Sequence, residues 1–231
     1  MRAWICLFKF ANYSTPSFKW SRENGSVTFS ILNLNGDEVA LEHLGRDERF
    51  SLREGDWVEI VDDGITLRGE AHPMYKVKSI DRDRLVVTLD VPDGATLPVY
   101  DGTSTSHPLL RRWDQKQLDP TLGYPEMADA DDGTPVGALV LGENNRLLIE
   151  DGIQVYFDSA TSDTPHTYRT GDYWLIPART ETGDVDWPGP ADDPKTVPPH
   201  GVQHHYAPLA FVGEAGSLDC RREIIVLWES V

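Results

Sequence analysis

The sequence predicts an all-β protein with very little helix: a small SH3-like barrel followed by a second β unit, a sandwich or another barrel-like structure. Short runs rich in Val, Ile, Tyr, Phe and Trp recur along the chain, and Gly, Pro, Asn or Asp bounds each of them. An apolar repeat of 3.6 residues, the pattern of an amphipathic helix, is nearly absent. Together these observations are typical of proteins built from short antiparallel strands.

Eight apolar runs carry the strand prediction. Two pairs of neighbouring runs are separated by so few residues that each pair is predicted to be a hairpin. One pair meets at residues 81–84, and the other meets at Glu150-Asp151-Gly152, where Asp-Gly favours a type I′ turn. A further turn is predicted at Asp62-Asp63-Gly64. The predicted strands are residues 26–32, 56–62, 75–81, 84–90, 146–151, 153–158, 172–178 and 223–229.

Changes in composition divide residues 17–231 into three predicted parts. A region rich in Pro, Gly, Ser, Thr and Asp follows the barrel, and within it only residues 109–118 have a pattern compatible with a helical turn or two. A later loop, residues 184–199, contains too many prolines for a central strand. The predicted parts are residues 17–95, the barrel; 96–135, an irregular connection; and 136–231, the second β unit.

The net charge limits the expected partners. The 231 residues include 21 basic and 38 acidic side chains, a formal charge of -17. Such a surface repels phosphate groups, so we expect neither nucleic acid nor an anionic membrane as a partner. No run approaches the roughly 18 apolar residues of a membrane-spanning helix. Lys9 interrupts the apolar run at the start and no clean small-residue cleavage site follows, so no signal peptide is predicted.

The common catalytic signatures are missing from the sequence. It contains no G-x-S-x-G, no H-E-x-x-H, no P-loop and no G-x-G-x-x-G after a strand. The stretch DADDGTP, which begins at Asp129, resembles a calcium loop, but Gly133 occupies loop position 5, whereas an EF-hand needs glycine at position 6. The sequence therefore assigns no catalytic residue and favours a protein that is not an enzyme.

Three aromatic residues are candidate ligand-binding residues: Trp187, Tyr173 and Trp113. Exposed Trp and Tyr rings stack on sugar rings, and Trp187 is expected to be exposed because it lies in the Pro-rich loop. The alternative is that the loop folds back and Trp187 acts as a plug on the core. The residues favour the plug and leave carbohydrate binding open.

The stretch HGVQHHY contains the candidate metal ligands His200, His204 and His205. A zinc or copper site needs ligands that converge. In a β-strand, His204 and His205 point to opposite faces, so a shared metal requires a turn after His200 or a ligand from His166. The alternative is that a histidine and Tyr206 hydrogen-bond to neighbouring backbone. The pattern favours this structural role, and no cofactor is expected unless the histidines bind metal.

Six stretches in a fixed order carry a resemblance to a known family. The chain resembles, from about residue 17 to its end, the C-terminal half of a bacterial family of unknown function that is typically encoded beside phage-tail-like contractile injection systems. In residues 1–16 it departs from the family, whose usual N-terminal module is not seen there, and the resemblance therefore implies that residues 1–16 are an atypical N-terminal extension. The stretches are FKWSRENGSV (18–27), LGRDERFSLREGDWVEIVDD (44–63), HPLLRRWDQ (107–115), LIEDGIQVYF (148–157), YRTGDYWLIPARTETGDVDWP (168–188) and PPHGVQHHYAPLA (198–210).

The resemblance implies an accessory or structural β-protein of an injection particle. Its expected partners are then other proteins of the particle, and its expected location is the bacterial cytoplasm or the released particle. Three hypotheses result. The resemblance suggests a non-enzymatic structural or binding component of a phage-tail-like particle; alternatively, the acidic, aromatic-rich all-β composition suggests a carbohydrate-active protein, either a glycoside hydrolase or a sugar-binding module; and third, the histidine cluster suggests a small metalloenzyme with histidine ligands.

Overall fold

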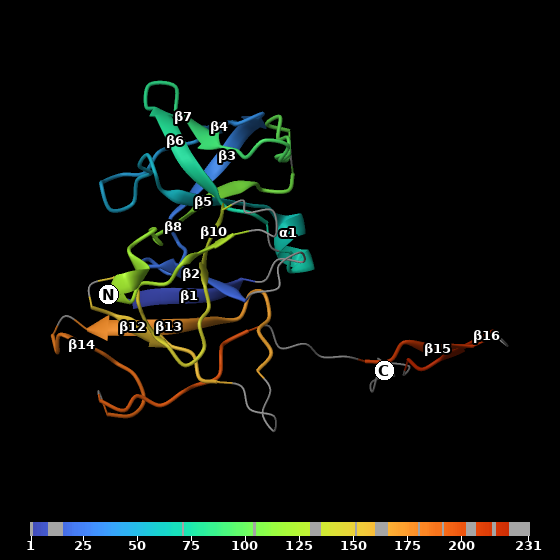
Figure 1. The fold of residues 1–231 in the computed structure, drawn as a ribbon. Helices are drawn as coiled ribbons and strands as arrows, with labels where there is room; N and C mark the ends of the chain where they lie inside the picture. Colours follow the sequence, from blue (N-terminus) through green and yellow to red (C-terminus); the bar gives the residue numbers. More distant parts are fainter. Residues whose placement is uncertain are drawn as a thin grey trace, which may run out of the picture. The chain divides into compact units, whose positions relative to one another are not determined.

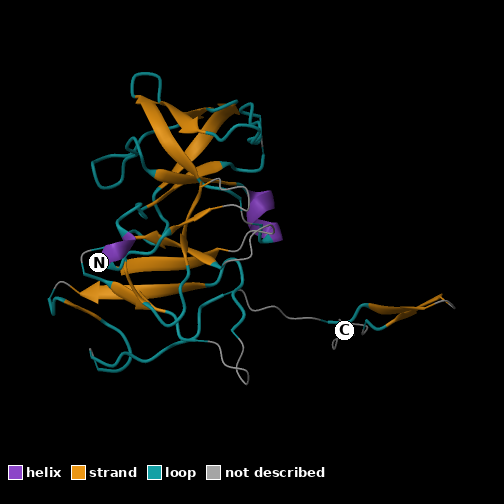
Figure 2. Ribbon diagram, viewed as in Figure 1, coloured by secondary structure: helices purple, strands orange, loops and turns teal. Residues whose placement is uncertain are grey.

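The computed structural model describes residues 2–8, 16–70, 72–103, 105–129, 135–150, 152–159, 166–179, 181–190, 192–201, 207–213 and 216–221. Short strands dominate these residues, which confirms the predicted all-β class (Figures 1 and 2). The helical elements described are α1 (Asp63–Arg68) and the 3-10 turn η1 (Pro120–Leu122). No helix in the described part of the chain is long and apolar enough to cross a membrane.

Six antiparallel strands close a barrel in the order β3-β4-β7-β6-β5-β8. Inward-facing side chains of these strands form one buried core, which includes Phe29, Val58, Val77, Val87 and Leu110. Alternate residues face this core, as the period of two in the sequence predicts. The predicted barrel is therefore confirmed. Its strands are β3 (Thr28–Asn35), β4 (Glu38–Leu41), β5 (Trp57–Val61), β6 (Tyr75–Asp81), β7 (Val86–Asp90) and β8 (Leu109–Trp113).

Strand β8 corrects the sequence prediction for residues 109–118. This segment was assigned to the irregular connection with a helical turn, but residues 109–113 pair with β3 on one side and β5 on the other and so close the barrel. The inward position 112 is an arginine, which hides the apolar alternation of a strand. A second correction concerns Asp62-Asp63-Gly64: Asp62 caps α1, and its Oδ1 accepts a hydrogen bond from the Ile65 amide at 2.7 Å.

A six-stranded sheet lies next to the barrel, in the order β14-β13-β1-β2-β10-β9 (Figure 1). Residues 2–8, expected in an N-terminal extension, form a central strand of this sheet, and residues 17–21, expected in the barrel, form its neighbour. The second β unit therefore takes strands from the segments before and after the barrel in the sequence. The strands are β1 (Arg2–Phe8), β2 (Ser17–Ser21), β9 (Met127–Asp129), β10 (Pro135–Val140), β13 (Tyr173–Arg179) and β14 (Asp184–Val185).

One face of the sheet is covered by a hairpin of β11 (Arg146–Leu148) and β12 (Gln154–Tyr156), which confirms the turn predicted near Gly152. Val155 of the hairpin packs into a core with Phe18 and Trp20 of β2. The alternate residues of β2, among them Lys19, are also buried although they are polar. Buried polar residues need partners, and Lys19 finds its partner in the barrel, the Glu59 carboxylate.

Residues 202–231 form a unit separate from residues 1–201. The structure describes in it a two-stranded sheet of β15 (Ala210–Gly213) and β16 (Gly216–Asp219). The strand predicted at residues 223–229 lies outside the described residues.

Candidate functional site

Four consecutive residues at the end of β8, Arg112 to Gln115, join the barrel to the sheet. The Arg112 guanidinium donates to two carbonyl oxygens of the loop between β4 and β5, Ser51 O at 2.5 Å and Arg49 O at 2.9 Å. It also lies 3.2 Å from Asp114 Oδ1. Arg112 is buried, so these contacts take the place of water around the charge.

Trp113 belongs to a buried ionic cluster that spans the two β units. Lys19 Nζ of β2 lies 2.7 Å from Glu59 Oε1 of β5, and the Trp113 indole N–H donates to Glu59 Oε2 at 2.9 Å. The Lys19 ammonium also lies 4.4 Å from the centre of the Trp113 ring. Lys19 is 4% and Glu59 is 6% exposed. Since desolvating two charges is costly, such a pair is stable only with several contacts of this kind.

Asp114 and Gln115 bind backbone groups of the sheet. Asp114 Oδ2 accepts from the Arg22 amide at 2.8 Å. The Gln115 side chain accepts from the Trp20 amide at 3.2 Å and donates to Gly137 O at 2.7 Å, so it bridges β2 and β10. The side chains of residues 112–115 are thus all engaged in contacts within the fold.

Gly137 of β10 shows how closely the barrel packs on the sheet. A Cβ atom at this position would lie 2.5 Å from Cε3 of Trp57 and 2.8 Å from Cβ of Met74, and the backbone φ is +76°. Met74, Trp113 and Ala138 form a buried cluster at the same contact. We call this contact, built by residues 112–115 with Lys19, Glu59 and Gly137, the barrel–sheet junction. The barrel and the sheet belong to one compact unit, residues 1–201.

The three candidate ligand-binding aromatics do not form one site: Tyr173 packs against the buried cluster that contains Trp113, whereas Trp187 packs against a different cluster. Trp113 is 1% exposed, so its ring is out of reach of a ligand at the surface. Tyr173 is half-buried beside the junction cluster, and its ring centre lies 5.4 Å from that of His200. Trp187 is half-buried and packs against the core on the other face of the sheet.

The Pro-rich loop is tied down by two indole groups. Trp187 Nε1 donates to Lys195 O at 2.9 Å, and Trp174 Nε1 donates to Val197 O at 3.0 Å. Both rings also contact the sheet core. This is the geometry of the plug that the sequence favoured for Trp187.

The candidate metal ligands are only partly described. His200 is exposed, and its backbone pairs with Tyr173 through two N–O contacts of 2.8 Å. His204 and His205 lie outside the described residues. His166 Nδ1 lies 3.9 Å from Glu143 Oε1. Among the residues that the structure describes, no three His, Cys, Asp or Glu side chains gather as a metal site requires.

Two tyrosines have perturbed acid–base behaviour for structural reasons. Burial, together with a hydrogen bond to Asp62 Oδ2 at 3.0 Å, raises the pKa of Tyr100 to about 12. Burial and a hydrogen bond to Glu143 raise the pKa of Tyr168 above its ordinary value. Both phenols are therefore protonated at neutral pH and act as hydrogen-bond donors.

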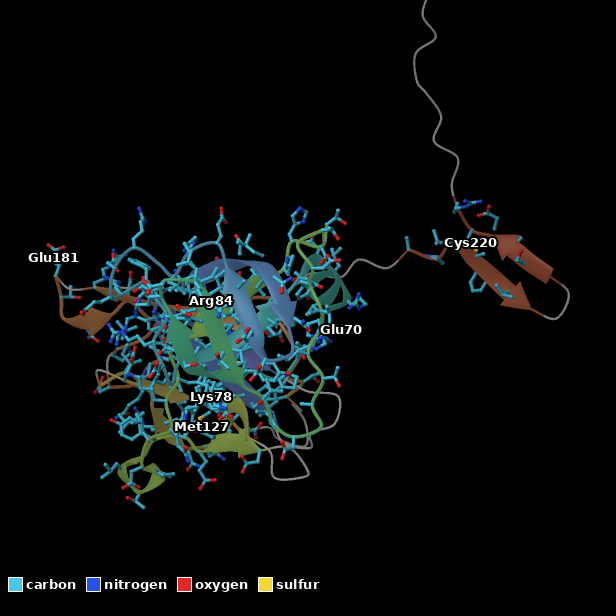
Figure 3. The ribbon with its side chains drawn as sticks, turned by 90° about the horizontal axis from the view of Figure 1, so that it is seen from above. Glu70, Lys78, Arg84, Met127, Glu181 and Cys220 are labelled. Carbon is cyan, nitrogen blue, oxygen red and sulfur yellow. The ribbon has the colours of Figure 1, made fainter. Side chains whose placement is uncertain are left out.

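The C-terminal hairpin, β15–β16, presents one wholly apolar face. Phe211 pairs with Leu218, and the Cys220 amide donates to Leu209 O at 2.9 Å, so these four side chains lie on the same side. Phe211, Leu218 and Leu209 are each 67% exposed. Figure 3 labels Cys220 at the base of the hairpin. The opposite face carries Val212, Ser217, Asp219 and Arg221.

The C-terminal hairpin and the β11–β12 hairpin differ in their surroundings. The β11–β12 hairpin places Leu147 and Val155 on the sheet core. The C-terminal hairpin leaves Phe211 and Leu218 exposed, although a two-stranded sheet alone is only marginally stable in water. Exposed apolar faces of this kind mark interaction sites. The C-terminal hairpin is therefore the candidate functional surface, and no sequence signal pointed to it, because the runs AFVG and GSLD are short and interrupted by glycine.

Comparison with known proteins gives a family. A search of the curated proteins found no match, and neither did a search of the solved structures. The model of a family of unknown function, DUF6519, matches residues 9–230, nearly the whole chain and including both the junction and the C-terminal hairpin. This protein therefore belongs to the DUF6519 family.

Proposed function

We propose that this protein is a non-enzymatic structural or binding component of a phage-tail-like contractile injection particle, and that it attaches to a neighbouring protein of the particle through its C-terminal hairpin. The observation that carries this proposal is the exposed apolar face of Phe211, Leu218 and Leu209. Burying a side chain of this size stabilises a contact by about 1.5–3 kcal/mol. A hairpin that cannot bury these groups in itself is suited to binding another protein.

The barrel–sheet junction supports the same role. Lys19, Glu59 and the segment from Arg112 to Gln115 are used to hold two β units in a fixed arrangement. A structural component of a particle needs parts that keep their arrangement, because its neighbours in the particle bind at fixed positions. The segment lies within HPLLRRWDQ, one of the stretches on which the resemblance to the particle-associated family rests.

The test is the presence of the chain in purified particles. A bacterium that carries the gene is given an epitope-tagged copy, and particles are separated by gradient centrifugation. We expect the tagged chain to sediment with sheath and tube proteins in a fixed ratio, because a structural component is present in every particle. A chain that stays at the top of the gradient while particles form normally contradicts the proposal.

The hairpin is tested in the same experiment. Phe211→Ser with Leu218→Ser removes the apolar face, and we expect this double variant to leave the particle fraction. Val212→Ser is the matched control, because Val212 is 85% exposed but lies on the opposite face. Equal loss of both variants, or of neither, excludes the apolar face as the attachment surface.

A further inference from the structure

The chain contains two Asn-Gly pairs, Asn24-Gly25 and Asn35-Gly36, and each lies in or beside a turn. Asn-Gly is a chemically labile pair, because glycine has no Cβ to hinder attack of its amide nitrogen on the preceding carboxamide. The attack requires a nitrogen that is free of other contacts and room for the ring that forms. The two pairs share the same chemistry, so the fold decides which of them reacts.

The fold leaves Asn35-Gly36 open to this reaction. Asn35 ends β3 and pairs with Glu38 of β4, so Gly36 and Asp37 form the turn of the hairpin. Asn35 and Gly36 are both exposed. An ideal Cβ at Gly36 has no atom within 4 Å, and the described residues offer its backbone N–H no acceptor. The nitrogen is therefore accessible, and the turn has room for a ring.

The fold protects Asn24-Gly25. Gly25 is buried, and its N–H donates to Ser21 Oγ at 2.8 Å. Ser21 is 0% exposed, and its Oγ lies 3.5 Å from Asp114 Oδ2 in the barrel–sheet junction. Attack by the Gly25 nitrogen requires loss of this hydrogen bond and movement of a buried stretch of backbone. The protected pair therefore lies beside the junction, and the open pair lies at the tip of a barrel hairpin.

We infer that Asn35 is a site of spontaneous covalent modification in the folded protein and that Asn24 is not. The Gly36 nitrogen loses its proton to hydroxide and forms a bond to Asn35 Cγ, while the bond from Cγ to its NH2 group breaks and ammonia leaves. Water then opens the resulting succinimide at either carbonyl and gives aspartate or isoaspartate. No oxidant or reductant is needed. This inference goes beyond the proposed function and does not depend on it.

The product changes the hairpin tip and leaves the barrel core in place. Isoaspartate adds one carbon to the main chain at the Asn35–Glu38 pair and places a new carboxylate beside Asp37. The next pair along the hairpin, Leu34 and Val39, is 0% exposed and holds the strands together. An exposed isoaspartate is the substrate of carboxyl methyltransferases that use S-adenosylmethionine. The hairpin tip thereby becomes a substrate for an enzyme of that class.

The experiment is peptide mapping by mass spectrometry on the purified full-length chain. The folded chain is kept in slightly alkaline buffer below its melting temperature, and samples are taken over time. The reaction replaces NH2 by OH, so a modified peptide shows the corresponding mass difference, and fragment spectra assign it to Asn35 or Asn24. We expect Asn35 to convert at least about fivefold faster than Asn24, because the Gly25 hydrogen bond must break before that nitrogen reacts.

The same measurement in concentrated guanidinium chloride separates the fold from the sequence. The two pairs are expected to convert at nearly equal rates there, because no contact holds either glycine nitrogen in the unfolded chain. Isoaspartate is measured in the folded chain by transfer of a labelled methyl group from S-adenosylmethionine, with an isoaspartyl methyltransferase as the reagent. Asn35→Gln is expected to lose nearly all methyl acceptance, because glutamine forms the corresponding larger ring much more slowly.

A serine variant tests the protection of Asn24. Ser21→Ala removes the acceptor of the Gly25 N–H and is expected to raise the rate at Asn24 severalfold without a change at Asn35. Ser26→Ala is the matched control, because the Ser26 hydroxyl donates to Glu23 O in the same turn and does not accept from Gly25. Circular dichroism spectra and melting temperatures show whether each variant is folded. If Ser21→Ala does not fold, the folded and unfolded wild-type rates decide the question.

Three results with the folded wild type overturn the inference: no conversion at Asn35, equal rates at the two asparagines, or faster conversion at Asn24. A rate difference that persists unchanged in guanidinium chloride also overturns it, because local sequence rather than the fold then selects the site. Methyl acceptance that remains in Asn35→Gln places the isoaspartate at another residue and has the same meaning.

Discussion

Lys19 and Glu59 meet in the interior of this protein with 2.7 Å between Nζ and Oε1, although one belongs to the six-stranded sheet and the other to the barrel. The Lys19 ammonium and the Glu59 carboxylate form an ion pair, and the Trp113 indole N–H donates a hydrogen bond to the second carboxylate oxygen. Removal of one partner leaves a buried charge without compensation, whereas replacement of both by apolar groups of similar volume is often neutral.

The first prediction concerns this pair. Glu59→Leu alone is expected to lower the free energy of unfolding by about 3–5 kcal/mol, because Lys19 keeps a buried charge. The double variant with Lys19→Met is expected to recover most of this loss. Urea denaturation of the two single variants and the double variant measures the coupling. Equal losses in the single and double variants contradict the interpretation.

The second prediction tests the close packing at Gly137. Gly137→Ala places a methyl group against Trp57 and Met74 in addition to forcing alanine into a positive φ. Gly36→Ala is the control, because Gly36 has a φ of +64° and no atom within 4 Å of its ideal Cβ. We expect the control to cost about 1–2 kcal/mol in stability and Gly137→Ala to cost a further ~1–3 kcal/mol. Equal costs at the two positions mean that the barrel does not press on β10.

The third prediction concerns the Pro-rich loop. Trp187→Phe keeps an aromatic ring on the core but removes the N–H that donates to Lys195 O, the carbonyl of a trypsin cleavage site. Trypsin is therefore expected to cut after Lys195 several times faster in the variant. Cleavage after Arg84, in the exposed turn between β6 and β7, is the internal standard and is expected to be unchanged. Equal rates after Lys195 in both proteins show that the indole does not hold the loop.

The fourth prediction is a pH dependence. Burial, the largest cause, raises the pKa of the Asp56 carboxyl above its ordinary value. The protonated form is then favoured in the folded protein, so this contribution to stability is present at low pH and is lost as pH rises through the folded-state pKa. Asp56→Asn keeps an acceptor oxygen for the Arg53 amide and removes the charge. We expect the variant to be more stable than wild type at about pH 7 and equal to it at about pH 3.

Urea denaturation at the two pH values measures this difference. Asp93→Asn, at an exposed position, has the same effect on net charge and is the control. If the control gains as much stability as Asp56→Asn, the gain comes from reduced overall repulsion and burial of Asp56 is not its cause.

The fifth prediction concerns metal. The HGVQHHY stretch is expected to be structural, so elemental analysis of the purified protein should find no stoichiometric zinc or copper, and a chelator should leave the melting temperature unchanged. His204→Ala and His205→Ala are compared with wild type under the same conditions. If the protein contains metal, and its removal by chelator lowers the melting temperature as much as these substitutions do, the histidines bind metal and the structural interpretation is wrong.

Local patterns predicted the local structure well. The hairpin of β6 and β7 and the hairpin of β11 and β12 follow from alternating runs joined by short turns, since both strands and the turn lie within about twenty residues of one another. The same patterns missed β8. One of its inward positions is occupied by Arg112, and this charged residue is stable in the interior because nearby carbonyl oxygens accept hydrogen bonds from it. The sequence also made Trp113 a candidate ligand-binding residue. No local pattern shows that it is buried, because its hydrogen-bond partner Glu59 is 54 residues away in the sequence.

By itself the sequence determined the all-β class and both the strands and the turns of the local hairpins, because the apolar period and the turn residues act over a few residues. Only the tertiary structure decided that β1 and β2 join β10 and β13 in one sheet, that Lys19 reaches Glu59, and that the face of Phe211 and Leu218 is left exposed. The physical reason is that strand pairing and burial depend on contacts between segments far apart in the chain, and no local pattern specifies which segments meet.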